Sequence, residues 1–318
     1  MLRWPLTLLL LLASSVAATA QTCSYSVTNV NFGSVNVLSS AAIDTTATIT
    51  INCSGGAVLG TVRLCPNLGE GSGGATATVR RMAMGGSLLN YQLYQDAART
   101  TVWGSYLWSF TPRPPSLSLT LSALGSGSLT RTVYARLPGA QSTAPPGAYL
   151  STFSATNAQL RYAPCAIVGG CPACSATLAG VTNASFTVNA TATSNCIVTA
   201  QNVDFGTSGV LRSNVDVAGQ LTVTCTANTS YTVGLNGGTT NSPPASRKMT
   251  KGAEAVTYGL YKDAARAQIW GDAATPGSTV PGTGTGLAQN LVVYGRVPPQ
   301  ATPSPGAYSD TVVVTVTY

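Results

Sequence analysis

Apolar and polar residues alternate along short stretches of this chain. Ala47-Thr-Ile49-Thr-Ile51 and Leu221-Thr-Val223-Thr are two examples, and Gly, Pro, Asn and Ser residues separate such stretches. Side chains of a β-strand point alternately to opposite faces, so a period of two rich in Val, Thr and Ile predicts antiparallel strands. No helix of useful length is predicted. The pattern therefore predicts an all-β fold built from sandwiches.

An internal repeat divides the chain into two homologous domains. Residues 91–104 return without a gap as residues 258–271, with Tyr-x-Leu-Tyr-x-Asp-Ala-Ala-Arg and Trp-Gly in both copies. Shorter matches keep the same order: Asn31-Phe32-Gly33 with Asp204-Phe205-Gly206, and Pro146-Gly-Ala-Tyr149 with Pro305-Gly-Ala-Tyr308. We therefore expect a first domain at residues 21–182, a connecting segment at 183–195 and a second domain at 196–318.

The first twenty residues have the pattern of a secretory signal peptide. Arg3 precedes an apolar run, and small residues end the segment at Ala18-Thr19-Ala20. The run is shorter than the roughly 20 apolar residues that cross a bilayer. We expect cleavage before Gln21 and export of the mature chain.

Eight cysteines in an exported chain predict four disulfides, because these bonds form in oxidising compartments. The repeat predicts two equivalent bonds, Cys23–Cys53 and Cys196–Cys225. The four remaining cysteines occur only in the first domain, and three pairings stay open among them: Cys65, Cys165, Cys171 and Cys174. The chain has no histidine, and we expect no metal site and no cofactor.

Charged residues make up only 8% of the chain, which suits a subunit that polymerises better than a free monomer. The net charge of +7 comes from scattered basic residues without a long run, so no nucleic-acid partner is expected. With no histidine and only nine carboxylates, the chain has few of the positioned acids, bases and nucleophiles that an enzyme needs. Asp96 and Asp263 are repeat equivalents in separate domains, which predicts structural hydrogen bonds and not a catalytic pair.

The two domains differ in how their strands end. The second domain closes on the alternating segment 311–318, so a further strand would have to come from another chain. Residues 184–193 follow the first domain and alternate strictly. One face of this segment carries Phe186, Val188, Ala190 and Ala192. We expect it to complete the first sandwich as a self-donor strand.

The repeated motifs and the Thr-Val-Thr-Val-Thr-Tyr ending resemble the spore coat protein U domain family. In that family such domains are subunits of archaic chaperone–usher pili. The resemblance implies immunoglobulin-like pilin sandwiches, the second one incomplete, and donor-strand complementation by an adjacent pilin subunit. It also implies two assembly partners, a periplasmic pilus chaperone and an outer-membrane usher.

Cleavage before Gln21 would leave two residues ahead of Cys23, too few for a donor strand. The subunit would then accept a strand without giving one, which predicts a place at the pilus tip on the cell surface. Two alternatives are a pilin of the fibre body and a secreted coat or matrix protein, which would need neither chaperone nor usher.

Two insertions in the first domain are candidate surface-binding loops. One is rich in aromatic residues and contains Tyr106, Leu107, Trp108 and Phe110. Exposed aromatic side chains provide large contact areas, although Trp108 and Phe110 could instead extend a strand into the core.

The second insertion places Ala166, Ile167 and Val168 among the additional cysteines, whose disulfides would rigidify the loop. A stapled linker without a ligand is the alternative. The resemblance implies that projecting hydrophobic loops attach to abiotic or host surfaces and promote biofilm formation.

A third segment, Arg80-Arg81-Met82-Ala-Met84, is basic and contains two methionines. Its counterpart in the second domain reads Arg247-Lys248-Met249, so a shared structural hairpin is expected there and not a binding site.

Overall fold

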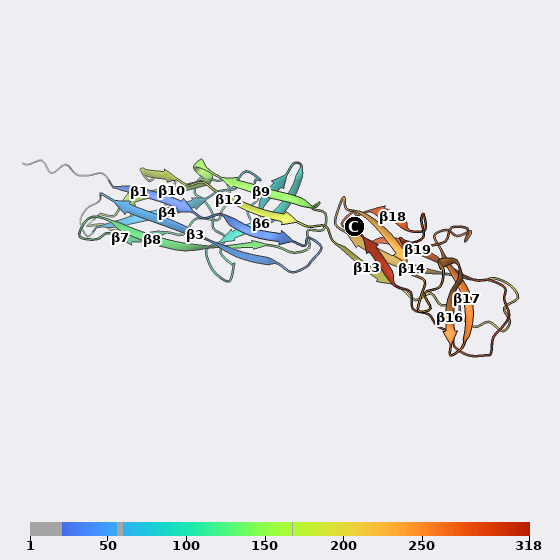
Figure 1. Ribbon diagram of the computed structural model, residues 1–318. Coiled ribbons are helices and arrows are strands. Elements are labelled where there is room, and N and C mark those ends of the chain that lie inside the picture. The colour runs from blue at the N-terminus through green and yellow to red at the C-terminus, as the bar shows by residue number, and fades with distance from the viewer. Residues whose placement is uncertain (1–20, 56–59, 167) are drawn as a thin grey trace, which may run out of the picture.

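The computed structural model describes residues 21–55, 60–166 and 168–318. The expected signal peptide and Ile167 lie outside the described residues. The described part of the chain is all-β, as predicted, with two single-turn 3₁₀ helices and no helix able to cross a membrane. Two β domains lie end to end, and β12 leads from the first into the segment that joins them (Figure 1).

The first domain contains strands β1 to β12. Their bounds are β1 Thr22–Val27, β2 Val30–Val35, β3 Ile43–Ser54, β4 Thr61–Leu68, β5 Arg80–Met84, β6 Ser87–Tyr94, β7 Leu117–Thr120, β8 Gly127–Leu137, β9 Gly147–Phe153, β10 Ala158–Pro164, β11 Gly180–Asn183 and β12 Phe186–Ala192. One sheet has the order β1-β3-β8-β6-β5-β9-β12-β2, and the other has the order β11-β10-β4-β7. Apolar side chains from both sheets form one core.

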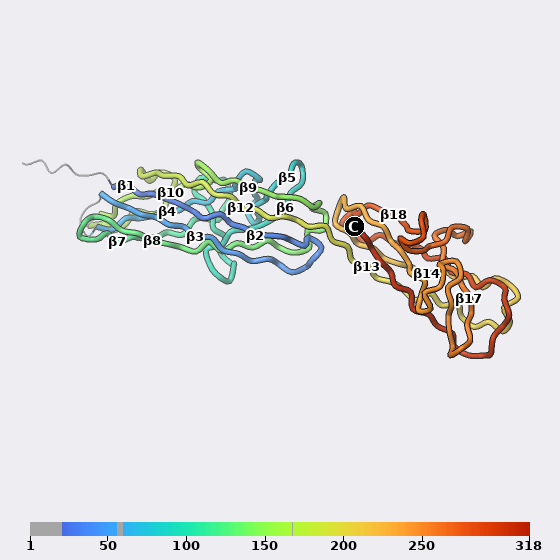
Figure 2. The backbone as a smooth tube through the Cα atoms, in the orientation of Figure 1, coloured from blue at the N-terminus to red at the C-terminus, as the bar shows by residue number. Residues whose placement is uncertain are grey.

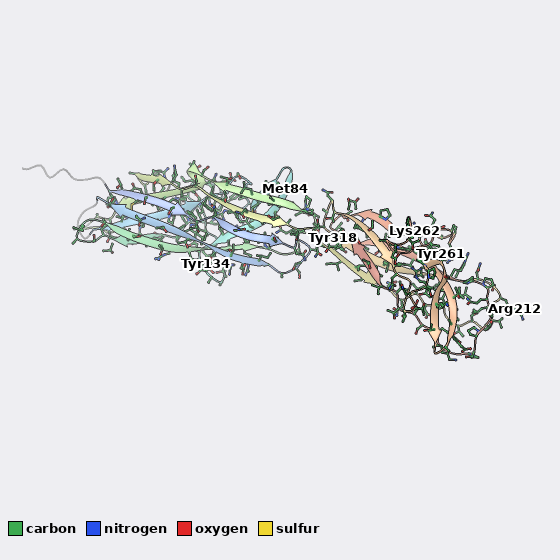
Figure 3. All side chains as sticks on the ribbon, in the orientation of Figure 1. Met84, Tyr134, Arg212, Tyr261, Lys262 and Tyr318 are labelled. Atoms are coloured by element: carbon green, nitrogen blue, oxygen red, sulfur yellow. A yellow bond between two sulfur atoms is a disulfide. The ribbon has the colours of Figure 1, made fainter. Side chains whose placement is uncertain are left out.

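The second domain repeats this plan with fewer strands. Their bounds are β13 Cys196–Ala200, β14 Val215–Cys225, β15 Ser230–Leu235, β16 Arg247–Lys251, β17 Glu254–Tyr261, β18 Val280–Thr283, β19 Gln289–Val297 and β20 Val314–Thr317. The sheet orders are β13-β14-β19-β17-β16 and β18-β15-β20. The chain ends close to the linker (Figure 2), where the Tyr318 hydroxyl, labelled in Figure 3, donates a hydrogen bond to Asn195 Oδ1 at 3.2 Å.

All eight cysteines are bonded. Cys23–Cys53 joins directly paired residues of β1 and β3, and Cys196–Cys225 joins the equivalent residues of β13 and β14. The other bonds are Cys65–Cys174 and Cys165–Cys171. Of the three pairings that the sequence left open, the structure contains this one.

The segments that contain Arg80 and Arg247 are structural hairpins, β5–β6 and β16–β17. Each arginine is buried and donates hydrogen bonds to backbone carbonyl oxygens. The repeated aspartates are structural as well. Asp96 accepts a hydrogen bond from the backbone N–H of Thr101 at 2.7 Å, and Asp263 accepts the equivalent bond from Gln268 at 2.8 Å.

Candidate functional site

In the first domain, β12 lies between two strands that are distant in sequence. It pairs antiparallel with β9, with Phe186 opposite Phe153 and Ala192 opposite Gly147. Its other edge pairs with β2 in parallel, with Val188 opposite Val30. The segment after the first domain thus fills the position between β9 and β2 in that domain's sheet.

The apolar face of β12 enters the core. All four predicted core residues are buried: Phe186, Val188, Ala190 and Ala192. The Phe186 ring stacks on that of Phe153 with centroids 4.5 Å apart, while Thr191 on the opposite face is exposed. Alternation along β12 therefore assigns one face to the core and the other to solvent.

The second domain has no described strand at the position that β12 occupies in the first. The counterparts of β2 and β9 are residues 203–208 and 306–312, and neither forms a strand in the described structure. The described β-bridge that either segment makes joins Ser309 to Thr250 of β16. We call these two segments the acceptor edge.

Side chains of the acceptor edge are more exposed than their repeat equivalents. Four residues beside β12 in the first domain are buried: Val30, Phe32, Tyr149 and Phe153. Their counterparts pack only partly buried against the second core: Val203, Phe205, Tyr308 and Val312. The second domain therefore presents apolar side chains and unpaired backbone where the first domain is closed by its own strand.

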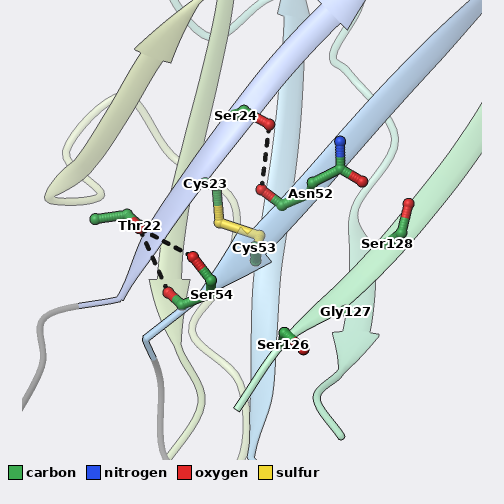
Figure 4. Close-up of a pocket in the computed structure, with 9 residues that line it drawn as sticks. All are labelled: Thr22, Cys23, Ser24, Asn52, Cys53, Ser54, Ser126, Gly127 and Ser128. Carbon is green, nitrogen blue, oxygen red and sulfur yellow. Dashed lines mark hydrogen bonds between the residues drawn. A yellow bond between two sulfur atoms is a disulfide. The ribbon is translucent and has the colours of Figure 1, made fainter. Parts of the chain in front are cut away.

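A shallow depression lies at the end of the first domain farthest from the second (Figures 1 and 4). Small residues at the ends of β1, β3 and β8 line it: Thr22, Cys23, Ser24, Asn52, Cys53, Ser54, Ser126, Gly127 and Ser128. None of these side chains is an acid, a base or a histidine, so the depression offers no general acid or base.

Two loops beside this depression expose apolar side chains, and we call them the distal loops. Leu124 lies in the turn between β7 and β8, and Val168 lies in the loop after β10. They are 91% and 90% exposed, the highest values among the described large hydrophobic residues. Both loops meet the start of β4, because Leu121 N–H donates to Gly60 O and Cys165 N–H donates to Thr61 O, each at 2.8 Å.

The loop that contains Val168 is braced across its base. The Cys165–Cys171 disulfide closes it, and the Ala166 N–H donates a hydrogen bond to Gly170 O at 3.0 Å. Ala166 is exposed, as expected. The sequence reasoning missed Leu124, although a large apolar residue within Ser122-Ala-Leu-Gly-Ser126 was a visible signal of an exposed turn.

The aromatic loop differs from both expectations. It forms no strand, and the four residues Tyr106, Leu107, Trp108 and Phe110 are half-buried. The Trp108 Nε1–H donates to Pro112 O at 2.9 Å, and the Arg80 guanidinium lies 4.7 Å from the indole centroid. These contacts hold the indole against the domain, so the loop neither projects freely nor fills the core.

The aromatic loop and the distal loops lie at opposite ends of β4. Tyr106 N–H donates to Asn67 Oδ1 at 2.7 Å, whereas Cys165 N–H contacts Thr61 O. Six residues of extended chain separate Asn67 from Thr61, a span of roughly 20 Å. Tyr106 packs against the cluster around the Cys65–Cys174 disulfide, but its loop and the loop of Val168 are attached at opposite ends of β4.

The Spore Coat Protein U domain family matches residues 8–156 and 182–315, once for each repeat. Protein U of Myxococcus xanthus is 35% identical over 108 residues, which cover 31% of this chain and 59% of that protein. The chain thus spans less than two thirds of the length of this relative.

Two solved structures are similar over nearly the whole chain. One is the chaperone–tip adhesion subunit pre-assembly complex from archaic chaperone–usher Csu pili of Acinetobacter baumannii, with 18% identity, a TM-score of 0.52, and coverage of 93% of this chain and 100% of that one. The other is the CupB6 tip adhesin from Pseudomonas aeruginosa, with 15% identity, a TM-score of 0.40 and coverage of 94% of each chain.

Proposed function

This chain belongs to the Spore Coat Protein U domain family, and we propose that it is the tip subunit of an archaic chaperone–usher pilus. In this proposal the first domain attaches to a surface and the second joins the fibre. The observation that carries the proposal is the difference between the two domains: β12 completes the first sandwich, whereas no described strand lies between the two segments of the acceptor edge in the second. Family membership also agrees with the expectation that the protein is not an enzyme.

The acceptor edge suits donor-strand complementation by the adjacent pilin subunit. An incoming strand would pair with the backbone of residues 203–208 and 306–312, and its alternate side chains would cover Phe205 and Tyr308. A periplasmic chaperone would cover the same edge before assembly, and an outer-membrane usher would exchange it for the neighbour. The similar Csu structure is a chaperone–tip adhesion subunit pre-assembly complex, which supports a chaperone as the partner before assembly.

The start of β1 supports a place at the tip. In our proposal residues 1–20 are a signal peptide that is removed before Gln21. The Gln21 side chain then donates a hydrogen bond to Ser54 O at 3.0 Å, and Thr22 already pairs with Ser54 in the sheet. The chain from Thr22 onward is therefore part of the first domain's own sheet and is not free to pair with another subunit.

The distal loops are the proposed contact with an abiotic or host surface, and through it the proposed route to biofilm formation. Val168 and Leu124 expose apolar side chains, and in this proposal their loops face away from the fibre. The Cys165–Cys171 bond limits how much loop entropy is lost on contact. Ala166 and Ile167 belong to the same proposed contact, and the half-buried aromatic loop contributes less.

Gold-labelled antibody on intact cells, viewed by electron microscopy, tests the position of the protein. A single label at fibre ends is the expected result. Label along the shaft would show a body pilin. Label on the cell wall without fibres would favour a coat or matrix protein.

A further inference from the structure

One residue of the acceptor edge breaks the apolar pattern. Tyr308-Ser-Asp310 in the second domain corresponds to Tyr149-Leu-Ser151 in the first, so a carboxylate stands where the first domain has a hydroxyl. The structure supports this correspondence, because Ser309 bridges to Thr250 as Leu150 pairs with Ala83.

Glycine contacts give the same correspondence independently. A Cβ at Gly71, whose φ is positive, would clash with Ser151 Oγ. A Cβ at Gly238, also with positive φ, would clash with a carboxylate oxygen of Asp310. Gly71 lies three residues after Leu68, and Gly238 lies three residues after Leu235. Leu68 and Leu235 accept equivalent hydrogen bonds from the two buried arginines. Ser151 and Asp310 therefore occupy the same place in the two domains.

The first domain shows what a bound strand does at this place. Ser151 of β9 lies directly opposite Val188 of β12, and both residues are fully buried. Directly opposed residues of an antiparallel pair have Cβ atoms roughly 5 Å apart. A strand that binds the second domain in the same register would bring one core-facing side chain against Asp310 and remove water from it.

Asp310 is only half-buried in the second domain, and it is held as a carboxylate. It accepts hydrogen bonds from Thr239 N–H at 2.7 Å, Thr311 N–H at 2.8 Å and the Tyr258 hydroxyl at 2.6 Å. Partial burial raises the pKa of Asp310, but the hydrogen bonds outweigh it and the pKa lies below its ordinary value. The group is therefore ionised at neutral pH.

Covering an ionised carboxylate with an aliphatic side chain is costly, because the lost water contacts are not replaced. We infer that the donor strand accepted by the second domain carries a neutral hydrogen-bond donor, a serine, threonine or asparagine, opposite Asp310, among otherwise apolar core-facing residues. This inference rests on the proposed donor-strand function. A lysine or arginine fits less well, because the buried guanidinium of Arg247 lies close enough to interact with the Asp310 charge.

The same residue would discriminate against strands like β12. A second copy of the chain would offer Val188 at the position opposite Asp310, and that strand would leave the carboxylate without a new partner. Asp310 thereby disfavours joining of identical copies through the β12 sequence and favours a different subunit as neighbour.

Two synthetic peptides test this on the mature chain, residues 21–318. One copies residues 184–193, and the other carries Val188→Thr, a change that keeps the shape of the side chain and adds a hydroxyl. Because β12 already fills the first domain, a bound peptide reports on the second. Fluorescence anisotropy of labelled peptide gives the dissociation constants, and thermal unfolding measures stabilisation of the second domain.

The threonine peptide should bind wild-type protein about tenfold or more tightly than the valine peptide. In Asp310→Ser, which copies Ser151, the preference should vanish or reverse. Equal binding of the two peptides to wild-type protein, or tighter binding of the valine peptide, would overturn the role of Asp310 while leaving the acceptor edge intact. Failure of both peptides to bind or to stabilise the wild-type chain would overturn the proposed acceptor function itself. The wild-type comparison decides even if the variant does not fold.

Discussion

The guanidinium of Arg80 donates a hydrogen bond to the backbone carbonyl oxygen of Trp103 at 2.6 Å, and Arg247 makes the same contact with Trp270 at 2.8 Å. Each indole in turn donates to a carbonyl, Trp103 to Pro66 and Trp270 to Val233. Both domains therefore contain a buried arginine, and the described hydrogen-bond acceptors of each arginine are neutral carbonyl or amide oxygens and not carboxylates. Burial lowers the pKa of Arg80 to about 10, so it stays charged at neutral pH.

Arg80→Ala should destabilise the first domain strongly. The change would leave the carbonyl oxygens of Gly69, Leu68 and Trp103 without their donor and open a void in the core. Each buried unsatisfied acceptor costs about 1–3 kcal/mol, so the free energy of unfolding should fall by about 3 kcal/mol or more. Urea unfolding of the mature chain measures it.

Arg131→Ala is the matched control for that experiment, because Arg131 is exposed and its side chain reaches only a neighbouring carbonyl. It should change stability by about 0.5 kcal/mol or less. Similar losses in both variants would contradict a structural role specific to Arg80.

Phe186→Ala tests whether β12 holds the first domain together. The ring is buried against Phe153, and its removal should lower the unfolding free energy of the first domain by about 3–5 kcal/mol. Thr191→Ala on the exposed face of the same strand should change it little. If thermal unfolding of the first domain is unchanged in Phe186→Ala, β12 does not complete that sandwich.

One ion pair in each domain should make the stability of that domain depend on pH in the acid range. Arg136 donates two hydrogen bonds to Asp44, and Arg296 does the same for Asp216; these bonds lower the pKa of each carboxyl. A carboxyl whose pKa is lower in the folded state than in the unfolded state stabilises the fold at pH values above its unfolded pKa of about 4. This stabilisation is lost as the pH falls through the folded-state pKa.

Asp44→Asn and Asp216→Asn should therefore lower the melting temperature at pH 7 and reduce its further fall below about pH 4. The effect should be about 1 kcal/mol or less per site, because these pairs are solvent-accessible. Melting curves between pH 2 and 7 measure it. A variant whose curve parallels that of the wild type at every pH would exclude the contribution.

Leu124→Ser combined with Val168→Ser should reduce attachment of piliated cells to plastic by about tenfold or more, because two exposed apolar contacts are lost. Fibre number and protein stability should not change. Val210→Ser, at an exposed valine of the second domain, is the control and should attach normally. Attachment that survives in normally piliated double-variant cells would remove the distal loops from the mechanism.

Trp108→Ser separates the aromatic loop from the distal loops. The indole contacts Arg80 and Phe110, so its loss should lower stability by about 1–3 kcal/mol while changing attachment less than the distal variants do. Attachment assays run beside thermal unfolding distinguish the two effects. A large loss of attachment with normal stability would assign surface binding to this loop instead.

Much of the architecture could be predicted from the sequence, because it depends on the order of residues that are close together in the chain and on the repeat. Alternation such as that of Phe186 and Val188 assigns a strand and its buried face, and the repeat of Tyr91–Trp103 as Tyr258–Trp270 predicts two copies of one fold. Both signals depend on neighbouring residues or on comparison of the chain with itself. Both signals can be recognised without knowing which strands pair.

Tertiary structure alone decided the rest, because it depends on residues far apart in the chain. It brought Leu124 beside the loop of Val168 through the start of β4, and it placed Arg80 against Trp108, which holds down a loop that composition alone predicts to be exposed. It also paired Cys65 with Cys174, and it placed Asp310 of the acceptor edge against the Tyr258 hydroxyl. Exposure and partners are properties of packed surfaces, and no local pattern encodes which distant residue will cover a given side chain.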